Sequence, residues 1–249
     1  MNVRLASRIL ISVIGLLGSV VSAQQPEQLI PALRPEVQTA AWAQSWWMPR
    51  HTEKLEAIKK QEKVDLLMIG DSITHGWESG GRKAWDKYYA PRHAFNLGFS
   101  GDRTENVLWR LQHGAVEGVS PKLAILMIGT NNAGHRQDKA EDTAAGVKAI
   151  VGELRARLPN MKILVLAIFP RGKDAGDSLR KLNDATNQIL AGLADNQHVF
   201  YLDVSAKFLE DGGVLPTAIM PDLLHPNEQG YEIWAEAMEP TVKQLLGEP

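Results

Sequence analysis

The chain contains no cysteine among its 249 residues. Without thiols it has no disulfide, no thiolate metal site, no cysteine nucleophile and no lipid-modified cysteine at a processed N-terminus. A domain of this length can bury a sufficient hydrophobic core without disulfides, so their absence is compatible with export. The length fits one large domain more easily than two.

An excess of charge of one sign is also missing. The formal net charge is −2, and no block of lysine and arginine occurs along the chain. Nucleic-acid-binding proteins usually carry a basic patch that neutralises phosphates. We therefore expect no nucleic-acid partner.

Several common site signatures are absent as well. The sequence has no Gly-x-Ser-x-Gly elbow, no His-Glu-x-x-His, no Gly-x-Gly-x-x-Gly and no Walker-type loop. These patterns mark a large class of serine hydrolases, zinc proteases, dinucleotide-binding domains and nucleotide-binding domains. Histidines and carboxylates do not cluster closely along the chain either, so we predict no metal and no organic cofactor.

The N-terminus has the pattern of a secretory signal. Arg4 and Arg8 precede an apolar run over 9–21, and small residues follow it as far as Ala23. We predict a signal peptide over 1–23, a linker over 24–41 and a folded domain over 42–249. An uncleaved anchor is the alternative, but the run is shorter than the ~20 apolar residues that span a bilayer. The expected location is secreted or periplasmic, with no stable membrane anchor after cleavage.

Short apolar runs alternate with stretches of helical spacing. The runs have strand length and lie at 64–69, 94–97, 123–128, 163–168 and 198–202. The helical stretches lie at 104–113, 141–158, 179–194 and 228–246, and a tryptophan-rich segment with helical spacing spans 42–61. This alternation predicts an α/β domain of three layers with a five-stranded parallel sheet.

Ser72 is the candidate nucleophile, because it follows the first apolar run and would lie at the carboxyl edge of the sheet, where ligands bind in such folds. A serine hydroxyl needs a neighbouring base, and Asp222 and His225 can supply one. Their three-residue spacing lets the carboxylate hold one ring nitrogen while the other faces the serine. Three alternatives remain open: Ser72 is a helix N-cap, Asp222 and His225 are an unrelated surface pair, or Ser100 is the nucleophile rather than a turn residue.

Gly98 and Asn131 are candidate oxyanion donors, together with the backbone N–H of Ser72. Each follows or ends a predicted strand, so both are expected at the same edge of the sheet. Acyl transfer needs fixed N–H groups directed at the charge that develops on the carbonyl oxygen. Taken alone, Gly98 is equally consistent with a tight bend and Asn131 with a turn.

These stretches resemble the four motif blocks of the SGNH (GDSL) hydrolases, in that family's order: Gly70-Asp71-Ser72, Gly98, Gly129–Asn132 and Asp222–His225. Within the family, further stretches resemble the catalytic subunits of intracellular platelet-activating-factor acetylhydrolase: 94–102, 107–111, 169–172 and 224–226. The similarity runs from about Trp46 to the C-terminus. It implies a flavodoxin-like sheet and ester hydrolysis through a serine acyl-enzyme. It also implies Ser72 as nucleophile, Asp222 and His225 as its dyad, Gly98 and Asn131 as oxyanion donors, and a homodimer, which no sequence feature shows.

Two features depart from the family pattern. Asn132 stands where many members have Asp, and the export signal is unlike the intracellular acetylhydrolases. These departures argue against the phospholipid substrate of the intracellular enzymes. The resemblance to exported SGNH hydrolases, several of which remove acetyl groups from carbohydrates, instead implies an exported esterase acting on short-acyl esters, acetyl foremost, of a carbohydrate or small molecule. The alternatives are a lipid-directed acylhydrolase or thioesterase, and a catalytically silent glycan-binding module. Four tryptophans could provide a platform on which a sugar stacks, or they could simply pack in the core or at the rim: Trp46, Trp47, Trp77 and Trp85.

Overall fold

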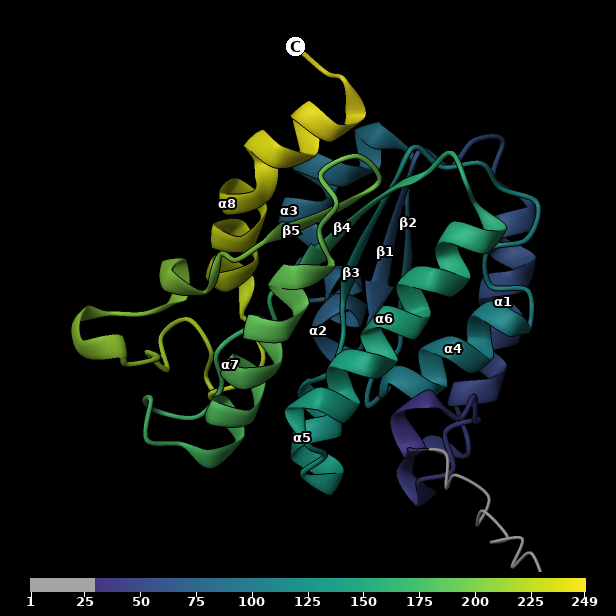
Figure 1. Cartoon of the computed structure of the whole chain (residues 1–249). Helices are drawn as coiled ribbons and strands as arrows, with labels where there is room; N and C mark the ends of the chain where they lie inside the picture. Colours follow the sequence, from purple (N-terminus) through teal and green to yellow (C-terminus); the bar gives the residue numbers. More distant parts are fainter. Residues whose placement is uncertain (1–29) are drawn as a thin grey trace, which may run out of the picture.

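The computed structural model describes residues 30–249 and confirms the α/β fold with a five-stranded parallel sheet (Figure 1). The strand order is β2-β1-β3-β4-β5, and all four strand pairings are parallel. The strands are β1 (Leu66–Gly70), β2 (Ala94–Gly98), β3 (Leu123–Met127), β4 (Lys162–Leu166) and β5 (Val199–Leu202). The predicted signal peptide, and residues 24–29 of the predicted linker, lie outside the described residues.

Eight α-helices are present between residues 30 and 249, joined by short 3₁₀ turns and one π turn. They are α1 (Trp47–Lys59), α2 (Ser72–His75), α3 (Arg82–Ala84), α4 (Thr104–Gln112), α5 (Thr130–Arg136), α6 (Ala140–Arg157), α7 (Ser178–Leu190) and α8 (Glu228–Leu246). Helices α1, α4, α6 and α7 cover one face of the sheet, and α2, α3 and α8 cover the other (Figure 1). The three-layer arrangement follows, because each face of the sheet must be buried against helices.

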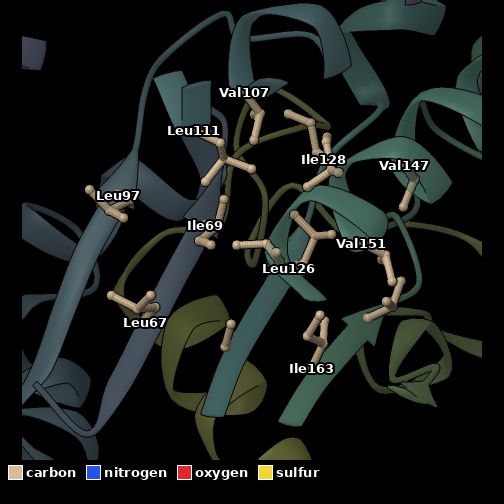
Figure 2. Close-up of a cluster of buried hydrophobic side chains, with 14 of the residues drawn as sticks. Leu67, Ile69, Leu97, Val107, Leu111, Leu126, Ile128, Val147, Val151 and Ile163 are labelled. Atoms are coloured by element: carbon tan, nitrogen blue, oxygen red, sulfur yellow. The ribbon is translucent and has the colours of Figure 1, made fainter. Parts of the chain in front are cut away.

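Side chains of each strand alternate between the two cores. In β1, Leu67 and Ile69 pack toward α4 and α6, whereas Leu66 and Met68 pack toward α8. Figure 2 shows part of the first of these clusters, to which Leu67 and Ile69 of β1 and Val107 and Leu111 of α4 all belong. Both sets are fully buried, and for this reason the strand is a continuous apolar run rather than an alternating one.

The boundaries differ from the predicted ones by one or two residues where an apolar run continues beyond its strand pairing. The first run is predicted over 64–69, and β1 covers Leu66–Gly70; the fourth is predicted over 163–168, and β4 covers Lys162–Leu166. Apolar content reports burial, and strand assignment reports backbone pairing, so the two need not end together. The last helix lies where its periodicity placed it, at Glu228–Leu246.

The order of the strands determines where a site can form. The chain passes from β1 outward to β2 and then returns to the other side of β1 as β3. The loops that leave β1 and β3 therefore diverge, and a crevice opens at the carboxyl ends of these two strands. Ser72 follows β1 and Asn131 follows β3 at this point.

Residues 30–41 pack against the domain, in contrast to the expected linker. The Ala32 side chain is fully buried, and its carbonyl oxygen accepts a hydrogen bond from Thr104 Oγ1 at 2.9 Å. The carbonyl oxygen of Glu36 accepts from Asn106 Nδ2, also at 2.9 Å. Gln38 is 6% exposed and donates to the carbonyl oxygen of Gly101 at 3.0 Å. The polar composition predicts a linker, but these long-range contacts make residues 30–41 part of the folded domain.

None of the helices found in residues 30–249 combines the length and apolar character required to cross a bilayer.

Candidate active site

Ser72 lies at the first position of α2, directly after β1. The Asp71 side chain caps this helix by accepting from the backbone N–H of Ile73 at 3.0 Å, so Asp71, not Ser72, is the N-cap. The turn is tight: a Cβ on Gly70 would lie 2.2 Å from Thr74 Oγ1, and only glycine fits there. Strand and helix together fix the Ser72 backbone and leave its hydroxyl at the edge of the sheet. Ser72 N–H, at the start of the helix, has no intrahelical acceptor.

The structure brings Ser72, His225 and Asp222 together in one hydrogen-bonded chain. Ser72 Oγ lies 2.8 Å from His225 Nε2, although 153 residues separate the two in the sequence. His225 Nδ1 lies 2.6 Å from Asp222 Oδ2. With Nδ1 protonated, His225 donates to the carboxylate and Nε2 can accept the serine proton, the arrangement of a serine nucleophile system.

Hydrogen bonds from its backbone N–H groups to the Asp222 side chain hold the turn that carries Asp222 and His225. Asp222 Oδ1 accepts from the backbone N–H groups of Leu224 and His225, at 3.1 and 2.7 Å. Leu223 adopts a left-handed φ of 59°, an unfavourable conformation for a leucine, and Gly172 N–H donates to its carbonyl oxygen at 2.9 Å. Partial burial acts to raise the pKa of Asp222, but the hydrogen bonds and positive charge of His225 hold that pKa below its usual range. Asp222 is therefore an ionised acceptor at neutral pH.

Burial gives neighbouring groups of the site unusual proton affinities. Desolvation raises the pKa of Asp71 to about 7, against the opposing influence of the Ile73 N–H and His225. Desolvation and the nearby Arg50 charge lower the pKa of His75 to about 4. His75 is therefore neutral at physiological pH and is a much weaker base than an ordinary histidine.

Gly98 does not present a free donor to the site, which corrects the predicted role. Its N–H donates to Asn96 Oδ1 at 2.7 Å, and its carbonyl oxygen accepts from Arg50 Nη2 at 2.9 Å. A Cβ on Gly98 would lie 2.2 Å from the backbone nitrogen of His75. Glycine is required here for the close approach of β2 to α2, and this steric demand explains the residue without an oxyanion role.

Gly101, three residues further along, has what Gly98 lacks: a backbone N–H with no acceptor among the described residues. Gly101 is buried and has a φ of 75°. Asn131, 6% exposed, donates through Nδ2 to the carbonyl oxygen of the adjacent Asp102 at 3.0 Å, which leaves one amide hydrogen. Gly101 was missed because the sequence offers two glycines in one turn and only backbone geometry distinguishes their N–H groups.

Buried ionic contacts hold the loop over 98–103 that carries Gly101. The fully buried Asp102 carboxylate accepts from Trp47 Nε1 at 2.6 Å and from Arg110 Nε at 2.8 Å. Desolvation raises the pKa of Asp102 to about 6, although Arg110 and Trp47 act against the rise. Phe99 N–H donates to Gly70 O at 3.0 Å, so the loop is joined to the strand that precedes Ser72.

The Asn132 side chain explains the departure from the family pattern at this position. Its Oδ1 accepts from Thr104 N–H at 3.1 Å, while its Nδ2 lies 3.0 Å from Asp138 Oδ2 and donates to it. A carboxylate could accept from Thr104 but could not donate to Asp138. An amide at 132 thus suits a protein that has an acid at 138.

A pocket of about 380 Å³ opens beside the candidate nucleophile. It is lined by Ser72, His75, Gly76, Ser79, Gly80, Ser100, His225, Pro226 and Tyr231. Ser100 Oγ lies 3.0 Å from His75 Nδ1, so the rival serine contacts a histidine with strongly reduced basicity. Tyr231 is buried, and its hydroxyl donates to the Ile73 carbonyl oxygen at 2.7 Å, which fixes this wall of the pocket.

Most of the tryptophans considered for sugar stacking are not available for it. Trp47 and Trp77 are 1% and 0% exposed, and Trp85 packs against Trp77 and Tyr89. Trp46 is partly exposed, and its ring centroid lies 6.1 Å from that of His75, which lines the pocket. For the other three, core or rim packing is the correct interpretation.

Potential metal ligands do not gather in groups of three or more anywhere in the part of the chain that the structure describes.

The sequence matches the model of the GDSL-like lipase/acylhydrolase family over residues 68–233. The alpha2 subunit of platelet-activating factor acetylhydrolase IB from Rattus norvegicus is 33% identical over 219 residues, covering 88% of this chain and 93% of the relative. The alpha1 subunit from Homo sapiens is 32% identical over 219 residues, covering 88% and 92%.

Solved structures show the same fold at lower identity. An acetylxylan esterase from Geobacillus stearothermophilus has a TM-score of 0.59 at 20% identity and covers 75% of this chain and 95% of its own. A GDSL-like lipase from Bacteroides thetaiotaomicron has a TM-score of 0.62 at 16% identity, covering 79% and 97%. The family match extends over more than half of the chain and includes Ser72 and His225. The chain belongs to the GDSL-like lipase/acylhydrolase (SGNH) family and is a carboxylic ester hydrolase of the GDSL type.

Proposed function

We propose that the protein is an exported serine esterase that removes short acyl groups, acetyl foremost, from a carbohydrate. The observation that carries the proposal is the contact of 2.8 Å between Ser72 Oγ and His225 Nε2, with Asp222 on the other ring nitrogen at 2.6 Å. A binding module without turnover would have no use for this alignment. Export is part of the proposal because of the arginine-led apolar N-terminus.

In the proposed reaction, Ser72 Oγ attacks the carbonyl carbon of the ester while His225 Nε2 takes the hydroxyl proton. Asp222 stabilises the imidazolium that forms and keeps the ring in place. Collapse of the tetrahedral intermediate breaks the bond to the alcohol, which receives the proton from His225 and leaves. Water, activated by the same histidine, then hydrolyses the acyl-serine and releases the acid.

The charge on the tetrahedral intermediate requires fixed donors, and we assign three. They are the N–H of Ser72 at the start of α2, the N–H of Gly101 and the remaining amide hydrogen of Asn131. Gly101 and Asn131 are linked through Asp102, whose carbonyl oxygen accepts from Asn131 Nδ2 at 3.0 Å. Because the three groups come from the ends of β1, β2 and β3, the sheet itself holds them in place before substrate binds.

Two observations support a short acyl group. The pocket beside Ser72 has a volume of only about 380 Å³, near the lower end of the range for ligand sites. The relatives and structural neighbours include platelet-activating factor acetylhydrolase subunits and an acetylxylan esterase. Both names describe enzymes that remove acetyl groups. The second name supports a carbohydrate as the alcohol partner.

The test is direct measurement of acetate released by the purified protein from a panel of acetylated sugars, simple acetate esters and long-chain acyl esters. We expect release from the sugars and a rate that falls as the acyl chain grows. A preference for long chains would favour the lipid-directed alternative. Binding of sugars with no turnover of any ester would favour the silent module.

Replacing Asn131 with alanine should lower turnover roughly 10²–10³-fold, about 2.7–4 kcal/mol of transition-state stabilisation. The lost amide hydrogen is needed when negative charge develops, so kcat should fall more than KM rises. Steady-state kinetics on an activated acetate ester measures both. Asn160→Ala, at an exposed position elsewhere, is the matched control and should behave as wild type. Equal kcat values for Asn131→Ala and wild type would remove Asn131 from the oxyanion site.

A further inference from the structure

A row of aromatic rings leads away from the pocket of Ser72. Trp42 is 51% exposed and stacks on Trp46, with ring centroids 6.2 Å apart and an interplanar angle of 25°. Trp46 lies 6.1 Å from His75, which lines the pocket. On the other side, Trp42 lies 6.3 Å from the ring of His135. The aromatic surface is therefore continuous with the site of the ester bond.

Trp42 also lies directly on the loop that carries the assigned oxyanion donor. A Cβ on Gly101 would be 2.0 Å from Cη2 of the Trp42 ring, so only a glycine leaves room for the indole. Gln38 Nε2 donates to the Gly101 carbonyl oxygen at 3.0 Å, which fixes the segment before Trp42 to the same loop. Trp46 Nε1 donates to the Trp42 carbonyl oxygen at 3.0 Å. The two rings are thus held rigidly rather than exposed by chance.

Polar groups border these rings. Arg103 Nη1 lies 3.4 Å from His135 Nδ1, at one end of the row. His75 and Ser100, at the other end, supply a neutral imidazole and a hydroxyl. Rigid apolar faces bordered by hydrogen-bonding groups suit a ligand that has a C–H face and hydroxyls at its edge, as a pyranose ring has.

We propose that Trp42 and Trp46 form a stacking subsite for the sugar ring whose ester Ser72 attacks, on the leaving-group side of the reaction. This inference rests on the proposed carbohydrate substrate. A membrane surface is less consistent with the observations, because the large exposed apolar side chains of residues 30–249 are only Trp42, Met48 and Ile189. Two of these lie close in sequence and the third lies on α7, too little apolar surface for docking on lipid.

The experiment compares kcat/KM for an acetylated sugar with kcat/KM for an activated acetate ester that lacks a sugar. In Trp42→Ala we expect the ratio of the two to fall about tenfold, chiefly through KM for the sugar ester. Trp42→Phe, which keeps an aromatic face, should recover most of the ratio. Met48→Ala is the matched control, since Met48 is 43% exposed and lies near Trp42 in the sequence.

Three results would overturn the subsite. They are unchanged kcat/KM values for both esters in Trp42→Ala, an equal loss on both esters, which would indicate that Trp42 acts only through the Gly101 loop, and a loss confined to long-chain acyl esters. Wild type that releases no acetate from any sugar would instead refute the carbohydrate substrate. The subsite is then judged by titrating Ser72→Ala with an unacetylated xylo-oligosaccharide and following tryptophan fluorescence. Absence of binding, or binding unchanged by adding Trp42→Ala, overturns it.

Discussion

Ser72→Ala is expected to lose roughly 10⁶ of the turnover, the scale on which serine hydrolases respond to removal of the nucleophile. The reason is geometric as well as chemical. Ser72 Oγ is the atom in contact with His225 Nε2, and no other hydroxyl of the described chain makes that contact. Turnover of an activated acetate ester by the purified protein measures the effect. A thermal melt shows that the variant is folded.

Ser100→Ala is the matched comparison for this prediction. Ser100 lines the same pocket and also contacts a histidine, but the pKa of that histidine, His75, is lowered to about 4 by burial and the Arg50 charge. A histidine with so low a pKa is too weak a base to accept the proton of a serine hydroxyl effectively at neutral pH. We expect Ser100→Ala to lose only a small fraction of the turnover that Ser72→Ala loses. The opposite ranking of the two variants would assign the nucleophile to Ser100.

Asp222→Asn is expected to lower turnover about 10⁴-fold, as the corresponding change does in serine protease triads. Asn retains the oxygen that accepts from the backbone N–H groups of Leu224 and His225, so the turn should persist. At the other position it presents an NH₂ group, which cannot accept from His225 Nδ1. The imidazole then favours the tautomer with its proton on Nε2, where it cannot accept the proton of Ser72.

Asp203→Asn provides a control for the loss of a carboxylate with a similar local role. Asp203 is exposed, and its Oδ1 accepts from Ser205 N–H at 2.8 Å, as Asp222 Oδ1 does within its own turn. Its turnover should equal that of wild type. If Asp222→Asn kept turnover within about tenfold of wild type, the 2.6 Å contact would not be what orients His225, and the dyad would have to be reassigned.

The strands and the longer helices could be predicted from sequence because their cause is local. Leu66 to Ile69 are apolar without interruption, since both faces of β1 are covered, and the periodicity at 228–246 follows from one buried face of α8. The triad candidates were also visible, because Asp222 and His225 lie within one turn and Ser72 follows an apolar run. Such patterns need only neighbouring residues to be recognised.

Other assignments depended on which backbone groups and side chains meet across the fold. Gly98 and Gly101 occupy the same turn, and only the acceptor at Asn96 shows that the first N–H is already engaged. Trp42 and Trp47 are five residues apart, yet one lies exposed over Gly101 and the other is buried on Asp102. These hydrogen-bond and packing partners cannot be predicted from the composition of the chain.

The sequence alone therefore determined the class of fold and the family, and it predicted the three side chains of the nucleophile system, since each of these is expressed in short stretches of residues. Tertiary structure decided that Ser72 contacts His225 across 153 residues, that residues 30–41 belong to the domain, and which N–H groups remain free. The physical reason is that hydrogen-bond partnership and burial are properties of the folded packing. Residues far apart in the chain create them, and no local pattern encodes them.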